Sequence, residues 1–433
     1  MLTKYAYRNL SETRKNHAAF IPLLLPFLAM EIVVILFVVI QGKSLYFLTQ
    51  ERSLFSSFAI IAAAAYMFLY VPIRKLKIIN TLDFIFLIFL FLNFYSILNS
   101  FLNERIDIIF LKQLFFFICM AFFYIYGRFV SPNATSNLSR SLFTGLILIH
   151  ITVQIANGMS PAVEPGFIAL SILMLFSATY KHSVFAQLVS LIIIIAYMAP
   201  IIPNLNRTLI GWILIFLTVT LFEISQKNKL ILAAAIAAAL SLVAVTTIAI
   251  QDYKIEKTES RSLARLNQLI SIARSGTTSK SVSISDRLYE IQGVERKFKK
   301  EAGPVDVILG FGASARYDAY LTAGTVFNNH NVHIGVYWEY LKRGYLGVTL
   351  FVMFNLAVLY SGIRQRDWSF QNRGEIRWYF FWYYIVSLMF WFTWANFYYT
   401  QVPVWMYVGM VFARKARETK FIRTKATLLM AKG

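Results

Sequence analysis

Long runs of apolar residues, separated by short polar connections, recur along almost the whole chain. A helix needs about 20 apolar residues to cross the hydrocarbon core of a bilayer. By this criterion the sequence predicts twelve membrane-spanning helices, of which the fifth to seventh and the last are short. Their ranges are 18–41, 54–73, 84–103, 108–127, 142–157, 166–180, 186–202, 208–225, 230–251, 344–363, 380–398 and 402–413.

One long polar segment interrupts this pattern between the ninth and tenth predicted spans. Apolar residues at helical spacing predict an amphipathic helix from Arg261 to Arg274 within it. A second helix is predicted from Asp286 to Glu301, with Ser285 as its N-cap and two lysines in its last turn. We therefore expect a folded, helical loop domain rather than an extended linker.

The predicted fold is an all-α polytopic membrane protein with three parts. Residues 1–251 form an N-terminal transmembrane bundle of about nine spans, and residues 252–343 form the loop domain. Residues 344–433 supply the C-terminal transmembrane helices and a basic tail.

The positions of Lys and Arg give this prediction an orientation. They gather in alternate connections, at both ends of the chain and around residues 74–77, 128–140, 227–229 and 364–377. Cytoplasmic loops of membrane proteins carry this excess of positive charge, so both termini are predicted to be cytoplasmic. The loop domain then lies on the outer face, because long loops cross a membrane largely regardless of their charge.

Composition supports the membrane class and excludes one alternative. The 433 residues are 58% hydrophobic and 15% charged, whereas soluble domains contain about 25% charged residues. The net charge of +21 is spread over many short connections and forms no contiguous basic domain, which argues against nucleic-acid binding. Cys119 is the single cysteine, so no disulfide forms within the chain.

Two arginines on the predicted outer face are candidates for binding phosphate. Arg207 lies in a tight turn between two spans, and Arg287 opens the second loop helix. Guanidinium groups bind phosphates through paired hydrogen bonds and keep their charge, which suits a diphosphate-linked substrate. Each also has a simpler interpretation. For an isolated arginine such as Arg207, the default interpretation is a side chain that reaches the lipid headgroups. For Arg287 it is a solvated position or a local ion pair.

His330 and His333 lie at the end of the loop domain. A helix starting near Asn329 would place both histidines and Tyr337 on one face. Histidine is a common general base for removing a proton from a hydroxyl group, although a single interfacial histidine is often only a hydrogen-bonded structural residue. The chain has no HExxH motif and no cysteine pair, so we predict no metal site.

The segment Gly310-Phe311-Gly312 contains half of a nucleotide-binding fingerprint. It follows no suitable strand and lacks a phosphate-loop lysine, so no nucleotide cofactor is predicted. A turn, or a close approach of the backbone to a ligand, explains the two glycines better.

These features occur in a fixed order: Asn206-Arg207-Thr208, Arg287, Gly310-Phe311-Gly312, His330-Asn331, Glu339, and Gly344 with Gly347. In this order, and in its predicted topology, the chain resembles the O-antigen polymerase and O-antigen ligase superfamily of bacterial envelope glycosyltransferases. The matching positions extend over roughly residues 200–350, and the preceding spans are similar in hydropathy alone.

The resemblance implies an enzyme of the bacterial inner membrane with a periplasmic active site. Its substrate would be an oligosaccharide carried by undecaprenyl diphosphate, without a nucleotide sugar, a metal ion or another cofactor. Arg207 and Arg287 would neutralise the diphosphate leaving group, and His330 would act as the catalytic base, with His333 as its rival. The residues assigned to substrate binding are His333, Asn331, Tyr337, Glu339, Arg265, Gly310 and Gly312.

The resemblance leaves the exact reaction open. The leading hypothesis is a polymerase that extends lipid-linked repeat units, with a chain-length regulator protein as a further partner besides the lipid bilayer. The nearest alternative is a ligase that moves the glycan onto the lipid A core. A flippase for the same lipid is a more distant alternative. Transporters place charged residues near the membrane midplane and often contain internal repeats, whereas no internal repeat is apparent in this sequence.

Overall fold

The computed structural model describes residues 81–103, 105–129, 282–320, 326–369, 375–392 and 395–413. All of them belong to one compact unit, formed by Met1–Leu142 and Ser279–Gly433. The described part is predominantly helical. Seven predicted spans, those at 18–41, 54–73 and the five between 142 and 251, lie outside the described residues, as does the predicted helix from Arg261 to Arg274.

Helices α4 (Thr81–Leu102) and α5 (Ile108–Gly127) form a pair that matches the predicted third and fourth spans. Asp107 caps α5 by accepting a hydrogen bond of 2.8 Å from the backbone N–H of Phe110. At the other end of the pair, the carboxylate of Asp83 on α4 binds Arg128, which follows α5. The cap fixes the start of α5, and the ion pair joins the end of α5 to the start of α4.

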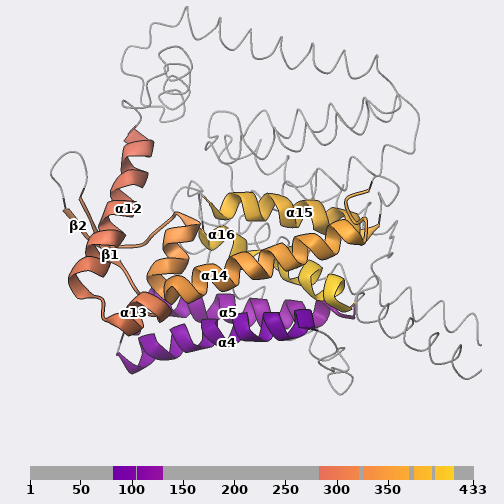
Figure 1. The fold of residues 1–433 in the computed structure, drawn as a ribbon, viewed down its shortest axis with the longest axis horizontal. Coiled ribbons are helices and arrows are strands. Elements are labelled where there is room, and N and C mark those ends of the chain that lie inside the picture. The colour runs from indigo at the N-terminus through magenta and orange to yellow at the C-terminus, as the bar shows by residue number, and fades with distance from the viewer. Residues whose placement is uncertain are drawn as a thin grey trace, which may run out of the picture. The chain divides into compact units, whose positions relative to one another are not determined.

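Helix α14 (Gly335–Arg364) is the longest helix in the described part, and it packs against α4 (Figure 1). It begins before the predicted start of the tenth span at residue 344. At Gly344 the backbone leaves the helical region, with φ 62° and ψ −163°, so α14 is kinked where the span was expected to begin.

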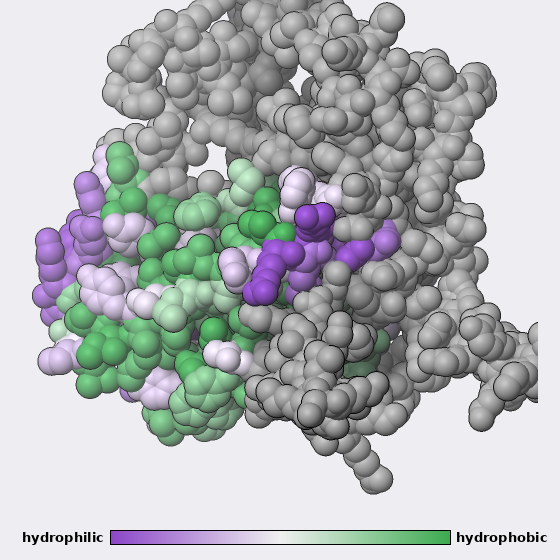
Figure 2. All heavy atoms as spheres, turned by 45° about the vertical axis from the view of Figure 1, so that its right-hand side comes forward, coloured by the Kyte–Doolittle hydropathy of each residue, from purple (hydrophilic) through white to green (hydrophobic). Residues whose placement is uncertain are grey.

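Among the described residues, three helices are long and apolar enough to cross a membrane, namely α4, Ile109–Gly127 of α5, and α14. Large apolar side chains such as Phe84 and Phe91 on α4 and Leu356 on α14 are exposed. In Figure 2 apolar side chains cover most of the visible surface of the described helices. An exposed apolar surface of this kind fits contact with lipid and supports the membrane class.

The predicted single span at 380–398 is wrong in one respect, because the structure contains two helices there. Helix α15 (Ile376–Trp391) is followed by the short helix α16 (Ala395–Thr400). The N–H of Ala395, at the start of α16, donates a hydrogen bond of 2.8 Å to the carbonyl of His333. This long-range contact has no signal in hydropathy. The helix Val402–Ala413 follows and matches the predicted last span.

Aromatic rings make many of the contacts between these helices. Phe89 of α4 stacks on Phe354 of α14 at a centroid distance of 5.1 Å. Phe351 of α14 stacks on Trp391 of α15 at 4.2 Å. Such pairs contribute about 0.5–1.5 kcal/mol beyond the burial of their area.

The described part of the loop domain lies at one end of α4, α5 and α14 (Figure 1). It contains helix α12 (Val282–Glu301) and helix α13 (Pro304–Leu309). Helix α12 confirms the predicted second amphipathic helix and the lysines in its last turn. It already begins at Val282, however, so Ser285 lies inside the helix and its prediction as N-cap is wrong.

A two-stranded antiparallel sheet follows, which the all-α prediction missed. Strand β1 (Tyr317–Tyr320) pairs with β2 (Val326–His330), and Tyr317 lies opposite His330. The predicted helix starting near Asn329 is therefore wrong, because His330 ends a strand and α14 starts at Gly335. Pairing with a partner strand decided the local conformation, and this partner is not visible in the periodicity of residues 326–337.

Candidate functional site

His333 lies in the short connection between β2 and α14, next to helix α12 of the loop domain. Its Nδ1 lies 2.9 Å from Oε1 of Glu290 on α12. Its backbone N–H donates to Oε2 of the same carboxylate at 3.0 Å. The two oxygens of Glu290 thus hold one residue at two points.

The backbone of the same connection is fixed on its other side. The carbonyl of His333 accepts the hydrogen bond from Ala395 of α16, and its neighbour Val332 is buried. Two residues further on, a side chain at Gly335 would collide with Trp391. The segment that carries His333 is consequently held between helix α12 on one side and the helices that follow α14 on the other.

The other predicted catalytic residues differ in how far the structure describes them. The backbone of His330 ends β2, and Arg287 lies in α12 one turn before Glu290; the structure describes no side-chain position for either. Arg207 and Arg265 lie outside the described residues. The structure therefore brings together the helix that carries Arg287 and the segment that carries His333.

Two of the predicted substrate-binding residues lie close to this segment in the sequence. Asn331 is half-buried, and its Oδ1 atom has no hydrogen-bond partner among the described residues. Tyr337, in the first turn of α14, donates a hydrogen bond of 3.3 Å to Glu295 of α12. Tyr337 is thus a second contact between α12 and the start of α14.

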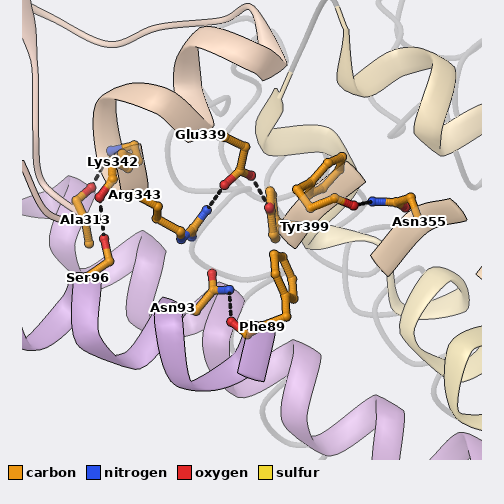
Figure 3. Close-up of polar contacts among 10 residues, drawn as sticks. Phe89, Asn93, Ser96, Ala313, Glu339, Lys342, Arg343, Asn355 and Tyr399 are labelled. Atoms are coloured by element: carbon orange, nitrogen blue, oxygen red, sulfur yellow. Dashed lines mark hydrogen bonds and ion pairs between the residues drawn. The ribbon is translucent and has the colours of Figure 1, made fainter. Parts of the chain in front are cut away.

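Glu339 is placed differently, because it is fully buried inside the helix bundle (Figure 3). Its Oε2 forms an ion pair of 2.5 Å with Arg343, one turn later on α14. Its Oε1 accepts a hydrogen bond from the hydroxyl of Tyr399 on α16. Protein side chains occupy both oxygens, which favours a structural role for Glu339 over the predicted contact with substrate.

Lys342, beside Arg343, is also buried and binds the backbone just before β1. Its ammonium group donates to the carbonyl of Ala313 (Figure 3). It also donates, at 3.5 Å, to the carbonyl of Ala315. The carbonyl of Lys342 in turn accepts a hydrogen bond of 2.9 Å from the hydroxyl of Ser96 on α4. Residues 339–343 therefore join α4, α16 and the segment just before β1.

Gly310 and Gly312 lie in the loop between α13 and β1, where this loop contacts the kink of α14. Gly310 has φ 76° and Gly312 has φ 97°, a region that favours glycine. A Cβ atom at Gly310 would collide with the backbone of Lys342 and Arg343, and one at Gly312 would lie 2.7 Å from Oγ of Ser100. The close backbone approach expected from these glycines is thus made to α14 and α4 of the protein itself.

The kink at Gly344 leaves backbone carbonyl groups of α14 without their usual partners within the helix. The loop between α13 and β1 donates hydrogen bonds to them. The N–H groups of Phe311 and Gly312 donate to the carbonyls of Leu341 and Lys342, at 3.0 and 3.2 Å. Backbone groups inside a membrane protein need such partners wherever a helix is interrupted. The broken turn of α14 is consequently a fixed junction between the loop domain and the span.

Comparison with known proteins adds no assignment to this geometry. The sequence matches no protein-family model, and no curated protein is significantly similar to it. Within the described ranges no group of three or more His, Cys, Asp or Glu residues is placed to hold a metal ion. The chemistry of the site must therefore be argued from its side chains.

Sequence patterns do not reveal several residues that matter in this site. Glu290 is such a residue, because its contact with His333 joins residues 43 positions apart. The pair of Glu339 and Arg343 has the i,i+4 spacing of a helical ion pair, so it had a readable signal. Tyr399 had none, since only the tertiary fold brings it to Glu339.

Proposed function

We propose that this chain is an O-antigen polymerase of the bacterial inner membrane. It transfers a growing glycan from undecaprenyl diphosphate to the non-reducing end of another lipid-linked repeat unit, at the periplasmic face and without a metal ion. The observation that carries the proposal is the contact of Glu290 with His333. It holds a polar, arginine-bearing helix against a histidine at the start of an apolar helix that can cross a membrane.

The chemistry of glycosyl transfer requires these groups at such a boundary. A lipid-linked sugar leaves its diphosphate only if the negative charge that develops on the leaving group is stabilised. Arg207 and Arg287 are fixed cations that can supply this stabilisation in place of a metal. A histidine on the same side of the membrane can remove the proton of the acceptor hydroxyl. The order of these residues along the chain is the one that suggested the family resemblance.

A gene deletion in the native host tests the proposed reaction directly. Loss of a polymerase leaves lipopolysaccharide that carries a single repeat unit, visible on a silver-stained gel. Complementation with the wild-type gene restores the ladder of long chains, whereas the variant Arg287→Ala leaves the single repeat. The matched control is Arg296→Ala, which removes an exposed arginine from the same helix and should restore the full ladder.

The same experiment separates the alternatives. A ligase deletion removes all O-antigen from lipid A while undecaprenyl-linked polymer accumulates. A flippase deletion also removes O-antigen, but no polymer forms and single lipid-linked units accumulate. Either pattern contradicts the polymerase proposal. Immunoblots of the membrane fraction verify that each variant is still inserted, so that a lost ladder reports lost activity.

A further inference from the structure

The contact between Glu290 and His333 determines which ring nitrogen of the histidine carries a proton. An ionised carboxylate can only accept hydrogen bonds, so a neutral imidazole facing Oε1 of Glu290 must carry its hydrogen on Nδ1. The basic lone pair of the ring then lies on Nε2, at the opposite edge. A carboxylate that holds a histidine in this form is the arrangement used to prepare a general base.

The exposure of Glu290 and His333 fits a buried carboxylate that positions an accessible imidazole. The side chain of Glu290 is 7% exposed, whereas that of His333 is 39% exposed. Water therefore competes little for the carboxylate, and the imidazole is accessible from outside the protein. The backbone of His333 is held as well, by Glu290 at its N–H and by Ala395 at its carbonyl. Such restraint keeps a reacting group in a fixed geometry.

His330 occupies a different kind of position. Its backbone ends β2 opposite Tyr317, while His333 lies three residues further, in the connection to α14. The two histidines therefore do not share a helix face. Of the two, His333 is the one whose side chain the structure describes, and it contacts a buried carboxylate.

We propose that Glu290 is a positioning residue that holds His333 with its hydrogen on Nδ1 and so makes Nε2 of His333 the base of the reaction. This inference rests on the proposed function. In the transfer step the hydroxyl of the acceptor sugar gives its proton to Nε2, and its oxygen bonds to the anomeric carbon of the donor glycan. The bond from that carbon to the diphosphate breaks, and undecaprenyl diphosphate leaves with the electron pair. The imidazolium then returns its proton to water.

A kinetic comparison of purified full-length variants in proteoliposomes tests this inference. The substrate is the undecaprenyl-diphosphate-linked repeat unit extracted from the deletion strain. The variant His333→Ala should lower kcat by about 10²- to 10⁴-fold, the range for a lost general base. Glu290→Gln should lower kcat by at least about tenfold while KM changes by less than about twofold, because the acceptor contacts remain. Glu290→Asp should recover part of the loss.

The control is Glu301→Gln, which makes the same replacement at an exposed end of the same helix and should leave kcat and KM unchanged. Wild-type kinetics in Glu290→Gln or His333→Ala, with activity lost in His330→Ala, would overturn the inference and leave the polymerase proposal standing. Failure of the wild-type protein to extend the extracted lipid would instead contradict the proposed function.

A spectroscopic measurement tests the role of Glu290 without any turnover. In protein labelled with ¹⁵N-histidine, the resonance that disappears in His333→Ala should report a ring with its hydrogen on Nδ1. In Glu290→Leu the same ring should lose this preference. A wild-type His333 found with its hydrogen on Nε2 alone would overturn the inference, whatever the kinetics show.

Discussion

Replacing Gly344 with alanine tests whether the kink of α14 depends on glycine. Gly344 has φ 62° and ψ −163°, a conformation that is essentially restricted to glycine. An added Cβ atom would also collide with the backbone of Ile308 and Leu309 at the end of α13. Helix α13 would have to move away, and the hydrogen bonds that Phe311 and Gly312 donate to α14 would be lost or weakened.

The expected loss of stability is the sum of the backbone strain at residue 344 and the lost hydrogen bonds. Backbone strain of this kind costs about 1–3 kcal/mol, and two lost hydrogen bonds add about 1 kcal/mol each. The total of about 3–5 kcal/mol corresponds to a fall in Tm of at least about 6 °C, if a domain of about 200 residues shifts by about 2–4 °C per kcal/mol. Thermal unfolding of the purified protein in detergent, followed by tryptophan fluorescence, measures the shift.

Gly303→Ala is the matched control. Gly303 has a φ of −83°, which any residue adopts, and a Cβ atom there would meet only Oδ2 of Asp306, at 3.5 Å. This variant should unfold within about 2 °C of the wild type. If Gly344→Ala unfolded at the same temperature as Gly303→Ala, the junction between α13 and α14 would not restrain the kink, and the reasoning would be refuted.

Two buried ion pairs give further predictions. Glu339→Gln and Arg343→Met should each destabilise the protein by about 3–5 kcal/mol, since each leaves a buried charge without its partner. The double variant should lose much less than the sum, and additive losses in thermal unfolding would contradict the pairing. Asp83→Asn or Arg128→Met should lower Tm and the yield of inserted protein by separating the ends of α4 and α5. Replacing the exposed Arg105 by methionine should change neither quantity.

The sequence predicted helices α4 and α5 closely, because the length of an apolar run is a local property. Both helices begin and end within a few residues of their predicted ranges. The α12 helix was also found from its local spacing of apolar side chains. The local pattern of apolar residues was therefore enough to predict helices whose apolar side chains face lipid or pack on one side only.

The remaining features depend on contacts between distant parts of the chain. The β1–β2 pair replaced a predicted helix around His330, because strand pairing outweighed the local periodicity. Gly344 was noticed as part of a glycine pattern, but the kink became clear only from its contact with α13. For the site, the sequence indicated His333 as a rival of His330 and gave no indication that Glu290 would bind it. That contact requires the loop domain to fold back onto the start of α14.

The charged first half of α14 has a consequence for how the protein is made. Residues Glu339 and Arg343 are buried, and the hydroxyl bound to Glu339 comes from Tyr399, which the ribosome synthesises 60 residues later. Charged side chains without a partner are costly to place in the hydrocarbon core, by up to about 2.5–3.5 kcal/mol each at its centre. We therefore expect this half helix to remain at the membrane surface during synthesis and to settle only after α16 has been inserted. The connection that carries His333, just before α14, would then be among the last parts of the protein to reach its final position.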